Sequence, residues 1–234
     1  LSALPGSLIL AEKEGDMDLS LPPQKHTSLT KHGQYSDSQF FLWSVLSVNN
    51  DQSFLSKVDQ ILNSAGYKSE LRYNSNDRYK VAPAKKIIDL VLSSSEVSFK
   101  MVLFEGIPAQ FKNMSPTERI QLQDRMYSDA LGSGLSGNLV TKSEDRYGPS
   151  ANYNASFSAK HGVTNKTVIA KNDRILQVND FIGGLCCAIL SQRTTKSKIK
   201  NEINQYFDSK VGLSAYIGKD LVQINKISVT KVKL

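Results

Sequence analysis

Four acidic side chains stand where an α/β protein places residues that bind ligands: Glu12, Glu70, Asp145 and Asp180. Three of them end or lie in predicted strands, and Asp180 lies on an apolar helix. In an open α/β sheet, strand ends and the helix starts that follow them form one rim, where ligands bind. Carboxylates gathered there repel one another unless divalent cations neutralise them, and Mg²⁺ prefers such oxygen ligands. The pattern predicts a two-ion site for Mg²⁺ or Mn²⁺ that cleaves phosphodiester bonds. The alternative is that these acids are ordinary surface residues, because strand ends are exposed.

The helix predicted over residues 174–192 has two different faces. At about 100° per residue, large apolar side chains form one broad face. A second stripe is narrow and consists of small or polar residues: Gln177, Asp180, Gly184, Cys187 and Ala188. A carboxylate buried on this stripe needs hydrogen-bond donors, a basic partner or a metal ion. We therefore expect a neighbouring element to pack against the stripe, with Gly184 small for that reason. The alternative is that Asp180 faces water beside a glycine-rich packing contact.

The remaining pattern alternates strands with helices, which indicates an α/β domain. The expected strands cover residues 7–11, 40–48, 97–104, 139–142 and 167–170, and the expected helices cover 52–64, a stretch from Pro83, 115–131, 174–192 and 196–208. Residues 40–48 are dense in aromatic and β-branched side chains, as in a central strand. Residues 16–39 are polar and predict a long functional loop or flap. Two strands before the first helix predict a mixed sheet with an antiparallel start.

Positive charge is concentrated at the C-terminal end of the chain. The net charge is +7, and residues 193–234 contain nine Lys and Arg against three Asp and Glu. A basic segment beside an acidic site suits a nucleic-acid backbone, through attraction and counterion release. We expect Lys196, Lys198 and Lys200 to contact the phosphates, and residues 221–229 to form an edge strand. The alternative is a solvated lysine-rich surface.

Several other classes of protein are disfavoured. No apolar run approaches the roughly 18 residues of a membrane span, and no secretory signal is visible. Adjacent Cys186 and Cys187 suit a reduced, cytoplasmic interior. The three histidines lack zinc-ligand spacing with cysteine. The glycine string that begins at Gly132 follows a predicted helix and precedes a strand, which is the reverse of a dinucleotide site.

The order of these motifs resembles the domain of unknown function 3800 family, which is RNase H-like in fold. The closing motif matches at Leu176, Gln177, Asp180 and Gly184, and the middle motif matches at residues 70–75. The opening motif, at residues 11–16, departs from the family pattern. It places Glu12 where the family has its first Asp and adds Lys13 beside it, while Asn179 replaces the usual Ala beside Asp180.

The resemblance covers about residues 7–192 and implies an α/β fold with an RNase H-like mixed sheet flanked by helices, so we expect this domain over residues 1–192. The charge pattern sets off residues 193–234 as a basic C-terminal extension, a helix plus an edge strand. The resemblance also implies a Mg²⁺- or Mn²⁺-dependent nuclease acting on RNA or DNA, with Glu12, Glu70, Asp145 and Asp180 as catalytic metal ligands. The altered opening motif favours an alternative, a catalytically inactive RNase H-like subunit. Such a protein would bind nucleic acid or other proteins in a larger complex for defence against mobile DNA, or for handling it.

Overall fold

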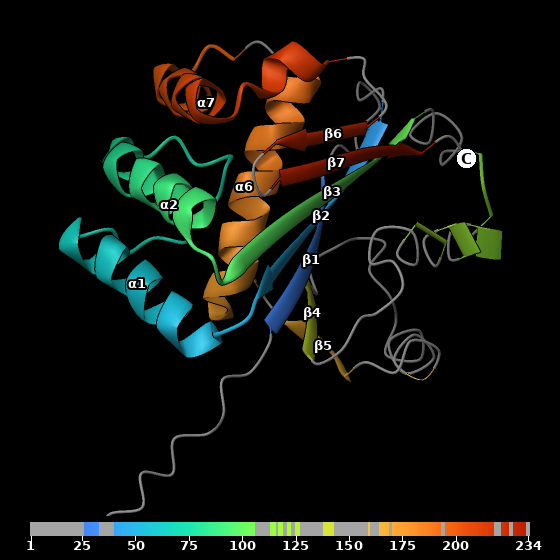
Figure 1. Cartoon of the computed structure of the whole chain (residues 1–234), viewed down its shortest axis with the longest axis horizontal. Helices are drawn as coiled ribbons and strands as arrows, with labels where there is room; N and C mark the ends of the chain where they lie inside the picture. The colour runs from blue at the N-terminus through green and yellow to red at the C-terminus, as the bar shows by residue number, and fades with distance from the viewer. Residues whose placement is uncertain are drawn as a thin grey trace, which may run out of the picture.

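Seven described strands form one mixed β-sheet in the computed structural model (Figure 1). The described residues are 26–32, 40–105, 138–142, 164–168, 170–192, 195–217, 221–224 and 227–232, with scattered positions at 113–126 and residue 159. The strands are β1 (His26–His32), β2 (Phe40–Val48), β3 (Val97–Glu105), β4 (Asn138–Lys142), β5 (Thr164–Val168), β6 (Leu221–Ile224) and β7 (Ile227–Val232). Their order across the sheet is β5-β4-β1-β2-β3-β7-β6.

The first three strands pair antiparallel, and the outer strands add parallel pairs on both sides. β2 pairs antiparallel with β1 and with β3. β4 runs parallel to β1, β5 parallel to β4, and β7 parallel to β3. The mixed sheet with an antiparallel start is therefore confirmed. β2 is its middle strand, and residues 42–46 are all buried, so both faces of this strand are covered, as its apolar sequence predicts.

Most of the helices begin at a residue whose side chain can cap them. The helices are α1 (Asp51–Ser64), α2 (Val81–Ser93), α6 (Arg174–Leu190) and α7 (Lys198–Val211), with short 3₁₀ turns η1 (Arg78–Lys80), η2 (Ala170–Asn172) and η3 (Leu213–Tyr216). The Asn50 side chain accepts a hydrogen bond from the Ser53 amide, and Asp173 accepts one from the Leu176 amide. A reciprocal capping box joins Ser115 and Glu118, as the predicted helix start requires.

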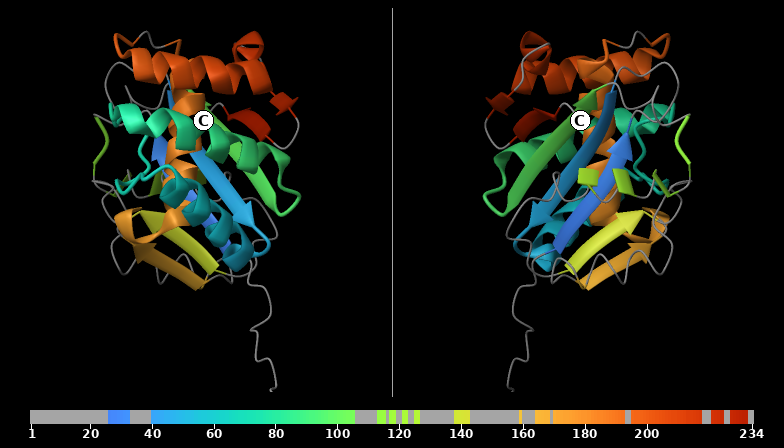
Figure 2. Two further views of the ribbon diagram at one scale, coloured as in Figure 1. Left: turned by 90° about the vertical axis from the view of Figure 1, so that its left-hand side faces the viewer. Right: turned by 90° about the vertical axis from the view of Figure 1, so that its right-hand side faces the viewer.

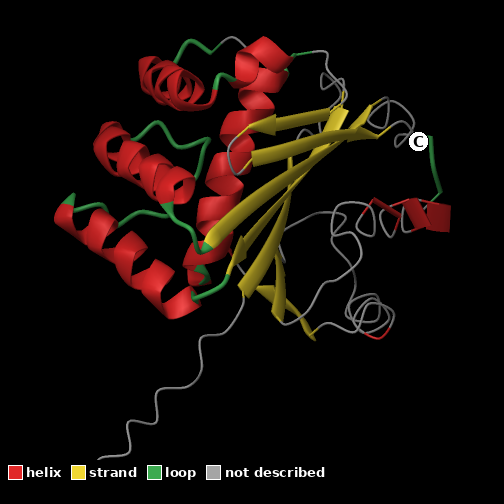
Figure 3. Ribbon diagram, in the orientation of Figure 1, coloured by secondary structure: helices red, strands yellow, loops and turns green. Residues whose placement is uncertain are grey.

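These four helices lie on one face of the sheet (Figures 2 and 3). α6 packs against β1 and β2, while α1, α2 and α7 pack around α6. The Asn179 side chain on α6 donates hydrogen bonds to the Ser28 carbonyl of β1 at 2.8 Å and to the Ser44 carbonyl of β2 at 3.1 Å. One amide group thus ties the central helix to two strands. None of the described helices is both long enough and apolar enough to cross a membrane.

Three expectations about strands need correction or concern residues outside the described part of the chain. The expected strand at 7–11 is outside the described residues. The expected loop at 16–39 is wrong for residues 26–32, which form β1 and include His26 and His32. This strand is polar in sequence, yet Thr27 and Ser28 are buried because β2, β4 and α6 surround them. The strand expected at 167–170 overlaps β5 only at residues 167 and 168, because residue 170 already begins η2, and β5 lies at an edge of the sheet.

The C-terminal segment continues the same sheet. Instead of one edge strand over 221–229, the chain forms an antiparallel hairpin of β6 and β7. β7 is hydrogen-bonded to β3, and β6 takes the edge position. The pairing of β7 with β3 joins residues more than a hundred positions apart, which a local pattern of alternation does not reveal.

Candidate functional site

A short irregular segment of the chain lies along the polar stripe of α6. We call residues 70–75 the docked segment. The Leu71 amide donates a hydrogen bond to Oε1 of Gln177 at 3.2 Å. Two turns further along α6, a Cβ atom added to Gly184 would lie 2.6 Å from Cβ of Tyr73, so only glycine allows this approach. Asp180 stands between Gln177 and Gly184 on the stripe. The predicted packing against Gly184 is therefore confirmed.

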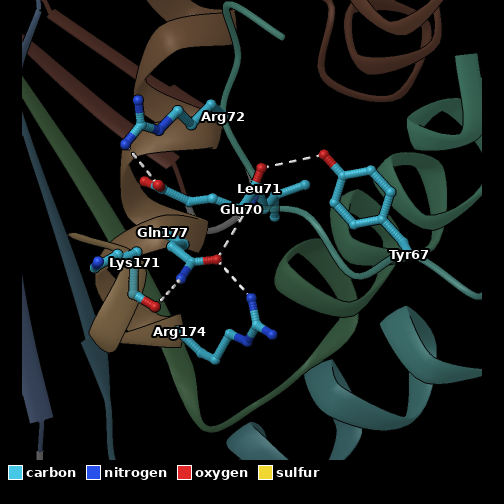
Figure 4. A network of polar contacts seen from close by, with 7 residues as sticks. All are labelled: Tyr67, Glu70, Leu71, Arg72, Lys171, Arg174 and Gln177. Carbon is cyan, nitrogen blue, oxygen red and sulfur yellow. Dashed lines mark hydrogen bonds and ion pairs between the residues drawn. The ribbon is translucent and has the colours of Figure 1, made fainter. Parts of the chain in front are cut away.

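Gln177 holds the start of the docked segment through its amide oxygen, and both ends of the amide are hydrogen-bonded (Figure 4). Its oxygen also accepts a hydrogen bond from Arg174 at 2.8 Å, and its nitrogen donates to the Lys171 carbonyl at 3.2 Å. The side chain is 1% exposed, so leaving these groups unpaired would be costly. On the other side of the segment, the Tyr67 hydroxyl donates to the Glu70 carbonyl at 3.1 Å.

Glu70 has a basic partner in its own segment. Its carboxylate lies 2.5 Å from a guanidinium nitrogen of Arg72, and the two side chains are 15% and 48% exposed (Figure 4). Leu71, between them in sequence, is buried in the core. This alternation leaves Glu70 and Arg72 on the side of the segment opposite Leu71. Asp180 is partly buried on α6.

Lys80 is a charged residue of the site that the sequence analysis did not select. Its side chain is fully buried, and its ammonium donates hydrogen bonds to the carbonyls of Arg72, Tyr73 and Ser75. The ammonium nitrogen also lies 5.4 Å from the centre of the Phe181 ring on α6. Burial and the nearby charge of Lys200 lower the pKa of Lys80 to about 8.

A signal for Lys80 exists in the sequence. It precedes the buried residues Ala84, Ile87 and Val91 by four, seven and eleven positions, so it falls on the apolar face of α2. A lysine on that face must be paired with hydrogen-bond acceptors when the face is buried.

Of the three lysines expected to bind phosphates, one contacts the docked segment. Lys200 places its ammonium nitrogen 5.6 Å from the centre of the Tyr73 ring. Asn204, one turn further along α7, donates a hydrogen bond to the Tyr73 hydroxyl at 3.2 Å. Lys196 and Lys198 are exposed beside the start of α7. The beginning of α7 therefore adjoins the segment that carries Glu70.

The structure describes two of the four expected metal ligands. Glu12 and Asp145 lie outside the described residues. Glu70 and Asp180 come from two elements that are packed together through Gln177 and Gly184. Within the described part of the chain, no three His, Cys, Asp or Glu side chains form a group that could hold a metal ion. The two described carboxylates fit part of an oxygen ligand set for a hard cation. The Glu70 carboxylate also forms an ion pair with Arg72.

Comparison with known proteins gives structural matches of low similarity. No protein-family model matches the chain, so membership of the family named above is not shown, and no curated protein matches it in sequence. The ribonuclease H2 structure from Pyrococcus horikoshii OT3 matches with a TM-score of 0.46 and 11% identity, covering 78% of this chain and 98% of that chain. A chain of the PCNA:RNase HII complex from Archaeoglobus fulgidus matches with a TM-score of 0.40 and 8% identity, covering 68% and 70% respectively. At these TM-scores the similarities carry no weight for function.

Proposed function

We propose that this protein is an RNase H-like nuclease that hydrolyses phosphodiester bonds of RNA or DNA with the help of Mg²⁺ or Mn²⁺. The observation that carries the proposal is the packing of the docked segment, which bears Glu70, on the stripe of α6 that bears Asp180. Two acids that are 110 positions apart in the sequence thus come from adjoining elements. The positive charge of Lys200 adjoins the same segment.

In this proposal Glu70 and Asp180 hold the metal ions, and Glu12 and Asp145 complete the ligand set. When bound, such ions lower the pKa of a water molecule and stabilise the charge on the departing oxygen. Arg72 orients the Glu70 carboxylate through their ion pair. Lys196, Lys198 and Lys200 attract the phosphate backbone toward the acids.

Two further features support the proposal. The RNase H-like assignment rests on the order of the sequence motifs and on the mixed sheet with an antiparallel start. A cytoplasmic location is proposed from the cysteines: Cys186 and Cys187 are adjacent and buried, and burial raises the pKa of the Cys186 thiol well above its ordinary value.

The decisive experiment replaces Asp180 with Asn and measures cleavage of single- and double-stranded RNA and DNA in Mg²⁺ and Mn²⁺. Asn keeps the size of the side chain but loses the charge that binds the ion, so we expect cleavage to be lost with the melting temperature unchanged. Asp208→Asn is the matched control. Its carboxylate accepts a hydrogen bond from the Ser214 amide, which Asn can also accept, and it lies on α7 away from the stripe. Undiminished cleavage by Asp180→Asn would exclude the proposed role of this residue.

The second candidate function is an inactive RNase H-like subunit that binds nucleic acid, alone or in a larger protein complex. The ion pair between Glu70 and Arg72 favours it, because a carboxylate already paired with a guanidinium is a weaker ligand for a metal ion. In that case the wild-type protein cleaves no substrate in either metal yet still binds nucleic acid. Replacing Lys196, Lys198 and Lys200 together by Ala would then weaken binding and reduce the slope of its salt dependence by up to about three.

A further inference from the structure

The docked segment turns around the ammonium group of Lys80. The carbonyls of Arg72, Tyr73 and Ser75 all accept hydrogen bonds from the Lys80 nitrogen. All three lie within four consecutive residues, so the backbone must turn to point them at one atom. The Ser75 amide also donates to the Arg72 carbonyl at 3.3 Å, which closes a turn. Carbonyl dipoles aimed at one point repel one another unless a cation lies there. Lys80 supplies this cation from the start of α2.

The surroundings of Lys80 suit an internal cation at neutral pH. The side chain is fully buried, and the faces of Tyr73 and Phe181 lie 6.0 and 5.4 Å from its nitrogen. Lys200 on α7 is the nearby like charge, and Asp77, just before η1, is the nearby opposite charge. The pKa of about 8 leaves the ammonium charged at neutral pH.

The two ends of the segment are held by different residues. Gln177 and Tyr67 bond the backbone at Leu71 and Glu70, while Lys80 bonds the backbone from Arg72 onward. Arg72 links the two halves, because its carbonyl accepts from Lys80 and its guanidinium pairs with Glu70. Loss of the Lys80 bonds would therefore free Arg72 and, through Arg72, the carboxylate of Glu70.

We propose that Lys80 is a positioning residue for the candidate metal site, because its buried ammonium shapes the docked segment, which carries Glu70 and packs against the α6 stripe that carries Asp180. The effect of Lys80 on metal binding rests on the proposed function. The effect of Lys80 on the order of the docked segment does not depend on any activity. The two consequences can therefore be measured separately.

The experiment compares Lys80→Met with the wild-type protein in two measurements. Hydrogen exchange of the amides at 71–75 reports the order of the segment, and Mn²⁺ titration followed by electron paramagnetic resonance reports the metal site. We expect the amides of the segment to exchange about tenfold faster or more, because the Lys80 hydrogen bonds are lost. A tenfold change corresponds to a decrease of about 1.4 kcal/mol in the free energy of local opening. We expect Mn²⁺ to bind about tenfold more weakly, while exchange in α1 stays unchanged.

Two variants serve as controls. Lys86→Met removes an exposed lysine from α2, which directly follows Lys80, and should behave like the wild type in both measurements. Lys80→Arg keeps the charge and several donors, so it should fall between the wild type and Lys80→Met. If Lys80→Met does not fold, Lys80→Gln, which keeps two donors without the charge, is measured against the same expectations.

The outcomes separate this inference from the proposed function. Unchanged exchange at 71–75 in the Met or Gln variant would overturn the positioning role, whatever the protein binds. Faster exchange with undiminished Mn²⁺ affinity would overturn the link from Lys80 to Glu70. A wild-type protein that binds no Mn²⁺ would refute the metal site itself, and with it the role of Lys80 toward that site.

Discussion

Helix α6 is buried on two sides by different means. Toward the sheet, Asn179 donates to carbonyls of β1 and β2 and holds the helix to the framework of the fold. On the stripe that bears Asp180, Gln177 receives a backbone amide, and Gly184 allows Tyr73 to approach its backbone. The first side joins two regular elements, whereas the second holds an irregular segment. One helix thus stabilises the fold through one side and positions candidate site residues through the other.

The largest effect is expected on the sheet side. Asn179→Leu removes both of these buried hydrogen bonds, and the loss of each costs about 1–2 kcal/mol. We expect the free energy of unfolding to fall by about 2–4 kcal/mol in urea titrations, with an unchanged dependence on denaturant. Asn63→Leu, at an exposed position of α1, is the control and should change little. Equal stability of the two variants would remove the proposed difference between the two sides.

The stripe should tolerate added volume poorly. Gly184→Leu forces its side chain against Tyr73, where even a Cβ atom would lie 2.6 Å from Cβ of that residue. Overpacking of this kind costs about 1–3 kcal/mol. In a Tyr73→Ala background the same change should cost less, because the obstructing side chain is gone. A melting temperature that does not move in Gly184→Leu would show that the docked segment does not press on the stripe.

A smaller effect is expected at Gln177. Gln177→Leu removes the acceptor of the Leu71 amide, and we expect a loss of about 1 kcal/mol, since one buried amide then lacks its partner. Hydrogen exchange should show the Leu71 amide opening faster, while the amides of β2 keep their protection. General loosening of the sheet in this variant would mean that the two sides of α6 are not separable.

The smallest effect concerns pH and the start of α6. Burial lowers the pKa of His26 below its ordinary 6.5, against the opposing influence of Asp173, whose carboxylate lies 3.7 Å away. Below pH 6.5 the unfolded chain therefore binds more protons at this residue than the folded chain, so stability falls as pH decreases. His26→Gln should reduce this loss, as measured by urea unfolding between pH 7 and 5. An identical pH dependence in both proteins would show that His26 does not contribute.

Local patterns determined much of the framework. The aromatic and β-branched run at 40–48 is β2, Asn50 caps α1, and α6 carries the stripe of small and polar residues that includes Gly184. These features depend on residues close together in sequence, where side-chain periodicity and capping chemistry are decisive. The same reasoning placed Glu70 and Asp180 on elements that do lie together.

Tertiary structure decided the rest. β1 has a polar sequence, and it is a strand because β2 and β4 supply its hydrogen bonds and Asn179 of α6, 151 positions away from Ser28, bonds to its backbone. β7 enters the sheet by pairing with β3, and no local signal names that partner. Lys80 is an internal cation because a turn of backbone carbonyls surrounds it. The sequence alone determined which segments carry apolar faces, caps and acids. Their partners were decided only in three dimensions, because hydrogen bonds and burial between distant segments depend on all the elements that pack together.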